Sequence, residues 1–357
     1  MHSTLELSEL TDHTGRLFMA GMPGPHLDVG TLSLIRDKGL GGVILFKRNI
    51  VDPLQVAALT NDLQDAAMKY QGVPLFLAVD QEGGRVARLQ KPFTRFPGNS
   101  AIGDASDSDK MAERFGRITA AEMRLLGLNM NMAPVLDVSS GPVDKVLQGR
   151  MFGDDPERVG HLGQTVIKAL QENGVMAVGK HFPGLGKVRL DPHHHPSAID
   201  VDEQELETVD LPPFRDAIRE RVSAIMTSHA LYSGLDAQCP ATLSHSIITE
   251  LLREKLGFQG LIITDDLEMG AIKKAPGVAQ GTVDAFEAGC DILLICEDQK
   301  LVREAMDRLR NRLLQNGHLL PRLHESVDRI MKAKKKFLKR WEPVSLKEVA
   351  RYFGHKA

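Results

Sequence analysis

The chain has 357 residues, of which 42% are hydrophobic and 25% are charged, and this composition is that of an ordinary globular protein. Its formal net charge of −3 leaves no basic excess to neutralise phosphates, so we expect no nucleic-acid partner. The three cysteines lack CxxC spacing, the first residues do not resemble a signal peptide, and no stretch of 18 residues is uniformly apolar. We therefore expect a cytoplasmic protein without disulfides and without a membrane span.

Eight short apolar runs follow one another along the chain, each bounded by Gly, Pro or Asp. They are too short for helices, and they lack the alternation of a half-exposed strand, so they predict strands buried on both faces of a parallel sheet. The runs occupy residues 16–21, 41–46, 74–79, 129–138, 175–182, 223–230, 261–266 and 291–296.

Longer amphipathic segments separate these runs and predict helices. The segment 155–174 (DPERVGHLGQTVIKALQENG) carries the usual boundary signals, with Asp155 as N-cap, Pro156 at the first helical position and Gly174 at the stop. Eight strands alternating with helices predict a (β/α)8 TIM barrel, an α/β fold. A doubly wound open sheet is the alternative, although no GxGxxG follows the first strand.

The C-terminal part of the chain predicts a helical extension of the barrel. We expect a single barrel domain over residues 1–340, followed by a tail over 341–357. The basic run MKAKKKFLKR (331–340) is interpreted as a solvated helix end rather than a binding patch.

Polar side chains stand at the carboxyl ends of six of the eight apolar runs. In a barrel these positions share one mouth, which is where enzymes of this fold carry their chemistry. Carboxylates among fixed donors suit a ligand with many hydroxyls, and a nucleophilic carboxylate needs a rigid support such as a strand end. The residues are Asp80, Asp137, Lys180, His181, Ser228, His229, Asp265, Asp266 and Glu297.

Several sequence blocks resemble glycoside hydrolase family 3. FQGLIITDDLEM (258–269) resembles the family's nucleophile signature. The blocks VDQEGGRVARL (79–89), KHFPG (180–184) and DPH (191–193) resemble its single-domain β-N-acetylglucosaminidase (β-hexosaminidase) branch. GGVILFKRN (41–49) and GRMFGDDP (149–156) stand in the family's order, so the resemblance covers most of the chain.

The resemblance implies the catalytic residues. Asp265 resembles the nucleophile that forms a covalent glycosyl-enzyme, and the branch uses a loop histidine with an aspartate two residues earlier as its acid/base pair. Here that pair is Asp191 and His193, with His194 as the alternative histidine. The chain departs from the usual pattern at Leu185, where a histidine is frequent, and at Pro192, where serine is common.

The resemblance also implies the substrate-binding residues and the reaction. It implies a retaining exo-β-N-acetylglucosaminidase without cofactor or metal, acting on a carbohydrate such as a muropeptide in peptidoglycan recycling. The three adjacent histidines 193–195 do not have zinc-site spacing, because neighbouring side chains diverge. The substrate-binding positions are Asp80, Arg88, Arg150, Lys180, His181 and, matched less closely, His229.

Other roles and functions stay open at the level of sequence. Glu82 is interpreted as a buried hydrogen-bond partner, Asp266 as a structural residue that satisfies backbone donors, and Asp137 as a residue that orients Arg150 or Lys180. A family 3 glycoside phosphorylase, a β-glycosidase for another sugar, and a sugar-binding barrel without catalysis are the alternative functions.

Overall fold

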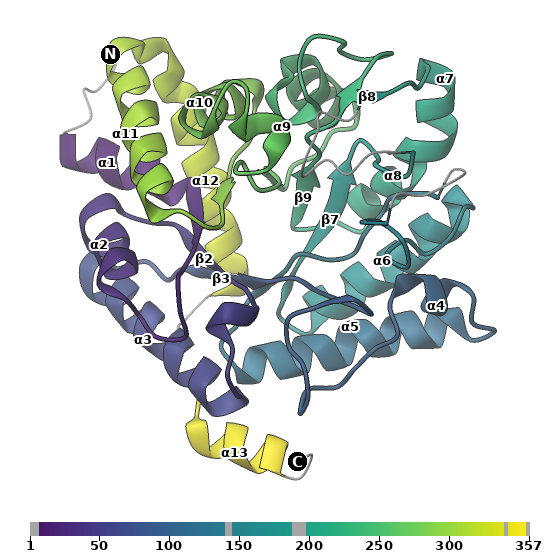
Figure 1. The fold of residues 1–357 in the computed structure, drawn as a ribbon, viewed down its shortest axis with the longest axis horizontal. Helices are drawn as coiled ribbons and strands as arrows, with labels where there is room; N and C mark the ends of the chain where they lie inside the picture. Colours follow the sequence, from purple (N-terminus) through teal and green to yellow (C-terminus); the bar gives the residue numbers. More distant parts are fainter. Residues whose placement is uncertain (1–6, 140–144, 188–197, 339–341, 355–357) are drawn as a thin grey trace.

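A computed structural model describes residues 7–139, 145–187, 198–338 and 342–354 of the chain (Figure 1). Its main sheet has eight parallel strands, and neighbours in the sheet are also neighbours in the chain order. This order is that of a (β/α)8 barrel, and it excludes the doubly wound alternative, in which the order reverses within the sheet. The strands are β1 (Phe18–Gly21), β2 (Gly42–Leu45), β3 (Phe76–Val79), β6 (Met130–Asn131), β7 (Met176–Phe182), β9 (Ala224–Thr227), β11 (Leu261–Ile263) and β12 (Leu293–Ile295).

The barrel closes along a seam between β11 and β12. Strand pairing there is reduced to one parallel bridge between Ile263 and Ile292. Side chains provide additional hydrogen bonds: Thr264 Oγ1 accepts from the N–H of Leu294 at 2.9 Å, and Asp291 Oδ2 accepts a main-chain N–H of β11 at 3.0 Å. Main-chain bonds also cross the seam, from the N–H groups of Asp291 and Ile292 to the carbonyl of Ile262 and from the N–H of Thr264 to the carbonyl of Ile292. The seam is therefore held by main-chain and side-chain hydrogen bonds together.

Helices connect successive strands around the outside of the barrel, as the amphipathic segments predict. The signals for residues 155–174 are confirmed: Asp155 caps the helix, Pro156 opens it, and Gly174 beyond its end has a φ of 80°. The connecting helices are α2 (Val29–Lys38), α3 (Pro53–Gln71), α5 (Ser108–Leu125), α6 (Pro156–Glu172), α8 (Leu211–Arg219), the wide helix η4 (Ser246–Lys255), α10 (Val278–Ala288) and α11 (Gln299–Gln315).

Short elements lie in the loops that follow the carboxyl ends of the strands. These loops form the mouth of the barrel, where the polar strand ends also lie. The elements are η1 (Lys47–Asn49), β4 (Gln81–Gly83), β5 (Val86–Ala87), α4 (Asn99–Gly103), β8 (Ala198–Ile199), α7 (Glu203–Glu205), η2 (Leu206–Asp210), β10 (Leu231–Tyr232), η3 (Ala241–Leu243) and α9 (Gly270–Lys273).

The fourth strand is shorter than its apolar run. The run 129–138 predicts a long strand, but β6 covers only Met130–Asn131. Pro134 has no N–H to donate to a neighbouring strand, so the regular ladder ends before it. Hydrogen bonds to β7 continue through the carbonyls of Ala133 and Pro134 and the N–H of Leu136. The chain beyond β6 thus follows β7 toward the mouth.

The opposite end of the barrel is covered by helices outside the repeat. α1 (Leu7–Arg16) precedes β1, and α12 (Leu320–Phe337) follows the short turn η5 (Gly317–Leu319) and runs across the amino ends of the strands. Within the described part of the run 331–340, the interpretation as a solvated helix end is wrong for Lys334. Lys334 is buried, and its ammonium donates to the carbonyl of Gly41 and lies 5.0 Å from the centre of the Phe76 ring.

Lys334 makes the stability of the fold depend on pH. Burial, together with the nearby charge of Arg16, lowers the pKa of Lys334 to about 7. The unfolded chain therefore binds a proton between pH 7 and about pH 10.4 that the folded chain lacks, so stability rises with pH over this range. In Lys334→Met this contribution is absent. Relative to the variant, we expect the wild-type free energy of unfolding to rise by about 3 kcal/mol from pH 7 to pH 10.

Urea unfolding of both proteins at pH 7, 8.5 and 10 measures this difference. Other lysines and tyrosines titrate equally in the two proteins, so their contributions to the difference in unfolding free energy cancel. Parallel pH profiles would show that Lys334 is charged in the folded protein throughout.

The last helix, α13 (Leu346–Gly354), lies at the lower edge of the molecule in Figure 1 and packs against α3. Val349 and Phe353 are buried, and the Phe353 ring meets that of Phe93 edge to face at 4.8 Å. Asn61 pairs with both main-chain groups of Val344. We propose that the barrel domain ends near residue 340, with this docked helix as its tail.

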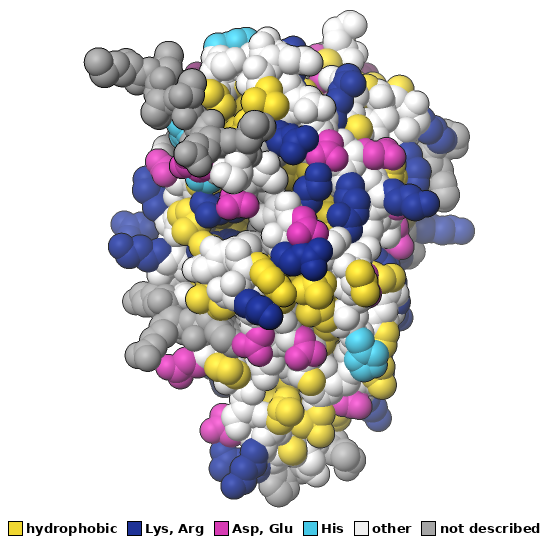
Figure 2. Space-filling model, turned by 90° about the vertical axis from the view of Figure 1, so that its left-hand side faces the viewer, with side chains coloured by type: hydrophobic (Ala, Val, Ile, Leu, Met, Phe, Trp, Pro, Cys, Tyr) yellow, Lys and Arg dark blue, Asp and Glu magenta, His cyan; other side chains and the backbone are white. Residues whose placement is uncertain are grey.

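The surface in Figure 2 mixes basic, acidic and hydrophobic side chains, as expected for a net charge of −3. Within the described parts of the chain, no helix is both long enough and apolar enough to cross a membrane.

Candidate active site

The mouth of the barrel contains a cavity of about 560 Å³ that gathers most of the polar residues singled out in the sequence. Such a volume suits a small ligand. A larger cavity, of about 670 Å³, lies at the opposite end of the barrel, but it contains none of the polar strand ends. The mouth is therefore the candidate active site. Its polar lining consists of Asp80, Glu82, Arg85, Arg88, Arg150, Lys180, His181, Asp265 and Asp266.

Glu82 is the centre of a buried ion network in the wall of this cavity. Its carboxylate binds Arg150 through two bonds of 2.8 Å each and Lys180 through one of 2.7 Å. Burial alone would raise the pKa of Glu82, but Lys180 and Arg150 outweigh it and lower the pKa to about 2. Glu82 is thus a permanently ionised partner, which confirms its interpretation as a buried hydrogen-bond acceptor rather than an acid/base.

Asp80 extends the network toward the open side of the cavity. Its two oxygens accept from Lys180 Nζ at 3.0 Å and from Arg88 Nη2 at 3.2 Å. Burial would lower the pKa of Lys180, but Glu82 and Asp80 raise it above its usual value. Basic and acidic groups therefore alternate along the wall, and each is held by ion pairs with its neighbours. Such an arrangement of donors and acceptors suits the recognition of vicinal hydroxyls.

His181 is oriented by Asp137. Asp137 is fully buried; its Oδ2 binds His181 Nδ1 at 2.8 Å and its Oδ1 accepts from the N–H groups of His181 and Leu185. The prediction that Asp137 orients Arg150 or Lys180 is wrong, because its hydrogen bonds go to the β7 end instead. Since Nδ1 donates to the carboxylate, Nε2 is the ring nitrogen left for the cavity.

We expect Asp137→Asn to reverse the tautomer of His181. The asparagine amide would donate to Nδ1, so that Nε2 carries the hydrogen and changes from acceptor to donor. Loss of such an orienting partner lowers kcat/KM by roughly 10- to 100-fold. In a His181→Gln background the same substitution should have little further effect, because the ring it orients is gone. Steady-state kinetics on the four proteins measures this, and additive losses would contradict the orienting role.

Asp265 lies directly beyond β11 and is partly exposed to the cavity. Burial raises its pKa, but electrostatic interactions with His181 and His229, a hydrogen bond from the N–H of Asp266, and Lys180 together hold the pKa below its usual value. That N–H donates to Asp265 Oδ1 at 2.8 Å. The carboxylate is therefore ionised at neutral pH and held on a rigid strand end, as a nucleophile requires.

Asp266 also lines the cavity, but its side chain serves the backbone. Its Oδ1 accepts from the N–H of Glu268 at 3.1 Å and from the N–H of Cys296 at 3.2 Å. This confirms the structural interpretation from the sequence. Burial and the neighbouring charges of Asp265 and Glu268 raise the pKa of Asp266 to about 7. The pKa values of the two adjacent carboxyl groups are thus shifted in opposite directions, that of Asp265 downward and that of Asp266 upward.

His229 is buried behind Asp266. Its Nδ1 lies 2.8 Å from Thr242 Oγ1, and its Nε2 lies 2.9 Å from the carbonyl oxygen of Asp266. It is not part of the cavity lining described above, unlike the other predicted substrate-binding residues. The geometry therefore favours a role for His229 in positioning the segment that follows Asp265.

Asp191, His193 and His194 lie outside the described residues. The described segments on either side of these residues lie in the loops at the mouth. Before them, Lys187 forms an ion pair with Asp210, and after them, β8 pairs in parallel with β10. Among the residues that the structure describes, no group of three or more His, Cys, Asp or Glu side chains could hold a metal ion.

The sequence did not predict that apolar residues would line the cavity. Phe46 follows β2 and lines the cavity, with the guanidinium of Arg48 4.7 Å and that of Arg88 5.5 Å from the centre of its ring. Met226 and Met269 line the cavity as well. The only signal for Phe46 was its place as the last residue of the apolar run 41–46, and core residues share such positions.

Comparisons with known proteins place the chain in a family. The model of the glycosyl hydrolase family 3 N-terminal domain matches residues 12–333. The chain is 38% identical to the β-hexosaminidase of Tolumonas auensis, over 82% of this chain and 86% of that protein. It is 37% identical to β-hexosaminidase A of Pseudoalteromonas piscicida, over 85% of this chain but only 54% of that protein, so it spans about half of that relative.

A solved structure agrees with this result. The family 3 β-N-acetylglucosaminidase from Paenibacillus sp. str. FPU-7 superimposes with a TM-score of 0.91 at 36% identity, covering 99% of this chain and 69% of that chain. The barrel, its carboxylate-lined mouth and these matches define a glycoside hydrolase. The chain belongs to glycosyl hydrolase family 3.

Proposed function

We propose that the chain is a retaining exo-β-N-acetylglucosaminidase that removes terminal β-linked N-acetylglucosamine through a covalent glycosyl-enzyme. The observation that carries the proposal is the ionised carboxylate of Asp265, fixed at the end of β11 and open to a cavity with a wall of paired charges. The relatives' names, β-hexosaminidase and β-N-acetylglucosaminidase, supply the sugar.

In the first step, Asp265 attacks the anomeric carbon while the bond to the leaving oxygen breaks. We propose His193 as the acid that protonates this oxygen, with Asp191 accepting from the other ring nitrogen. In the second step the same histidine takes a proton from water, and the water cleaves the glycosyl ester of Asp265. A histidine suits both steps near neutral pH, because its ordinary pKa is about 6.5.

The wall of the cavity is proposed to recognise the sugar. Asp80 and Arg88 lie at the open end of the ion network, and Arg150, Lys180 and His181 lie deeper along the same wall. Their groups are already paired, so a hydroxyl would join a preorganised set of donors and acceptors. Within a cell we propose cytoplasmic N-acetylglucosaminyl muropeptides from peptidoglycan recycling as the substrates.

A 5-fluoro N-acetylglucosaminide with an activated leaving group tests the mechanism. The fluorine slows the second step, so the glycosyl-enzyme accumulates, and peptide mass mapping should place the label on Asp265. A label on another residue, or release of the α-anomer as first product, would overturn the proposal. Repeating turnover with and without phosphate separates hydrolysis from phosphorolysis, since only the latter yields a sugar phosphate.

A further inference from the structure

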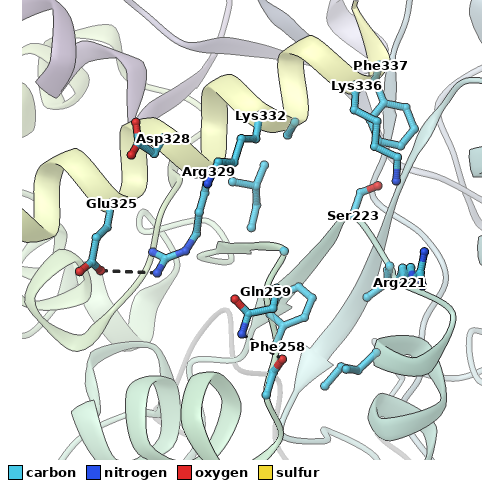
Figure 3. Close-up of a pocket in the computed structure, with 16 residues that line it drawn as sticks. Arg221, Ser223, Phe258, Gln259, Glu325, Asp328, Arg329, Lys332, Lys336 and Phe337 are labelled. Carbon is cyan, nitrogen blue, oxygen red and sulfur yellow. Dashed lines mark hydrogen bonds and ion pairs between the residues drawn. The ribbon is translucent and has the colours of Figure 1, made fainter.

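The cavity at the amino end of the barrel has no part in the proposed catalysis. It has a volume of about 670 Å³ and lies between α12 and the turns that lead into β9 and β11 (Figure 3). This volume is within the range of pockets that hold small organic ligands.

The walls of this cavity combine apolar and basic side chains. The apolar part comes from α8, from the two turns and from the end of α12, and it would bury an aromatic or aliphatic body of similar shape. The apolar lining residues are Ile218, Val222, Phe258, Leu261, Ala333 and Phe337.

Basic side chains reach the cavity from opposite walls. Lys332 and Lys336 extend from α12, and Arg221 extends from the turn after α8. In Figure 3, Lys336 and Arg221 point toward the same part of the cavity. Within the described part of the chain, none of the three forms an ion pair with a carboxylate; Lys336 has only the adjacent Phe337 ring, 4.9 Å away.

The remaining charges do not neutralise these three. Arg329 is already bound by Asp291 at 3.2 Å and by Glu325 at 3.5 Å. Glu325 thus faces Arg329, and Asp328 is the other acidic residue of the lining. The lining therefore keeps a positive excess, which attracts anions.

Arg221 is held in a strained conformation. It has a φ of 58°, the positive value that favours glycine, and it is the one non-glycine residue with positive φ in the part of the chain described. The cause is the end of α8: Val222 donates back to the carbonyl of Ala217, which puts Arg221 at the position that glycine usually takes. An arginine at this position places a cation at the cavity, although its positive φ is less favourable than it would be for glycine.

We propose that this cavity is a second binding site, for a small amphiphilic anion whose apolar body packs against the partly exposed Ile218 and Phe337 and whose acidic group meets Arg221 and Lys336. Three observations support it: the size of the cavity, its paired apolar and unneutralised basic walls, and the strained residue that completes them. The site is separate from the barrel mouth and does not depend on the proposed function.

Two fluorescent probes with the same ring system test the site. 8-Anilinonaphthalene-1-sulfonate carries an anionic group, whereas N-phenyl-1-naphthylamine is neutral. Lys336→Gln and Arg221→Gly should each weaken binding of the sulfonate by roughly threefold, and the double variant by about tenfold. Binding of the neutral probe should not change. Lys335→Gln is the matched control, because Lys335 is exposed on the same helix but does not line the cavity.

Arg221→Gly also separates binding from folding. Glycine relieves the positive φ, so the variant should melt at the same or a higher temperature while it binds the sulfonate more weakly. The proposal would be overturned if Lys335→Gln weakens the sulfonate as much as Lys336→Gln does. It would also be overturned if the double variant binds the sulfonate as the wild type does.

Discussion

Replacing Asp265 by asparagine should lower kcat on an aryl β-N-acetylglucosaminide by on the order of 10⁴-fold, with little change in stability. The amide cannot form the glycosyl ester, but its oxygen can still accept the 2.8 Å hydrogen bond from the N–H of Asp266. We expect the free energy of unfolding to change by less than about 1 kcal/mol for that reason. Turnover and urea unfolding, measured on the same preparation, test both parts.

A second substitution at this position distinguishes a nucleophile from a binding residue. Asp265→Gly leaves a space beside the anomeric carbon, and added azide can enter it. Azide then forms a bond to that carbon as the aryl oxide leaves, and the product is the α-glycosyl azide. Asp265→Asn should not be rescued, because the amide fills the space. Equal rescue of both variants, or none in either, would contradict the assignment of Asp265.

Replacing Glu82 by glutamine should damage both stability and substrate binding. Removing one partner of a buried ion network leaves the others uncompensated, and such changes cost about 3 kcal/mol or more. Arg150 and Lys180 would lose their common anchor, so we expect kcat/KM to fall by at least about 10²-fold. Glu113→Gln is the matched control, since Glu113 pairs with Arg117 where both side chains are 53% exposed.

The same variant should change the response to acid. The pKa of Glu82 is lowered to about 2 in the folded protein, against about 4.5 in the unfolded chain. Its stabilising contribution is fully present above pH 4.5 and is lost as the pH falls toward 2. The stability gap between wild type and Glu82→Gln should therefore shrink by about 3 kcal/mol across this range. A constant gap would mean that Glu82 is not ionised in the fold.

The barrel could be predicted from the sequence because its strands are buried on both faces. Burial on both faces selects continuous apolar runs, and the residue that ends each run is then placed at the mouth by the fold itself. Asp80, Lys180 and Asp265 could be placed at one cavity in this way. The same rule located the ends of β1, β2, β3, β7 and β12 to within one residue, whereas β9 and β11 end three residues before their runs do and β6 ends seven residues before its run does.

Partner choice within the site could not be predicted, because it depends on side-chain directions in three dimensions. Asp137 selects His181 rather than a basic residue, since its carboxylate also meets the N–H groups at the end of β7. Lys334 gave no sign of burial, because it lies among lysines that remain exposed. The acid/base pair Asp191 and His193 stays a prediction.

The closure of the barrel has a consequence for Asp265, the proposed nucleophile. Asp265 stands between Thr264 and Asp266, and both neighbours reach across to accept an N–H from the β12 side, at 2.9 and 3.2 Å. The carboxylate of Asp265, the proposed nucleophile, is therefore carried by a short span of chain that side-chain and main-chain hydrogen bonds fix at both ends. Thr264→Val would remove one of these side-chain bonds and loosen the support of the proposed nucleophile, while leaving every residue that lines the cavity unchanged.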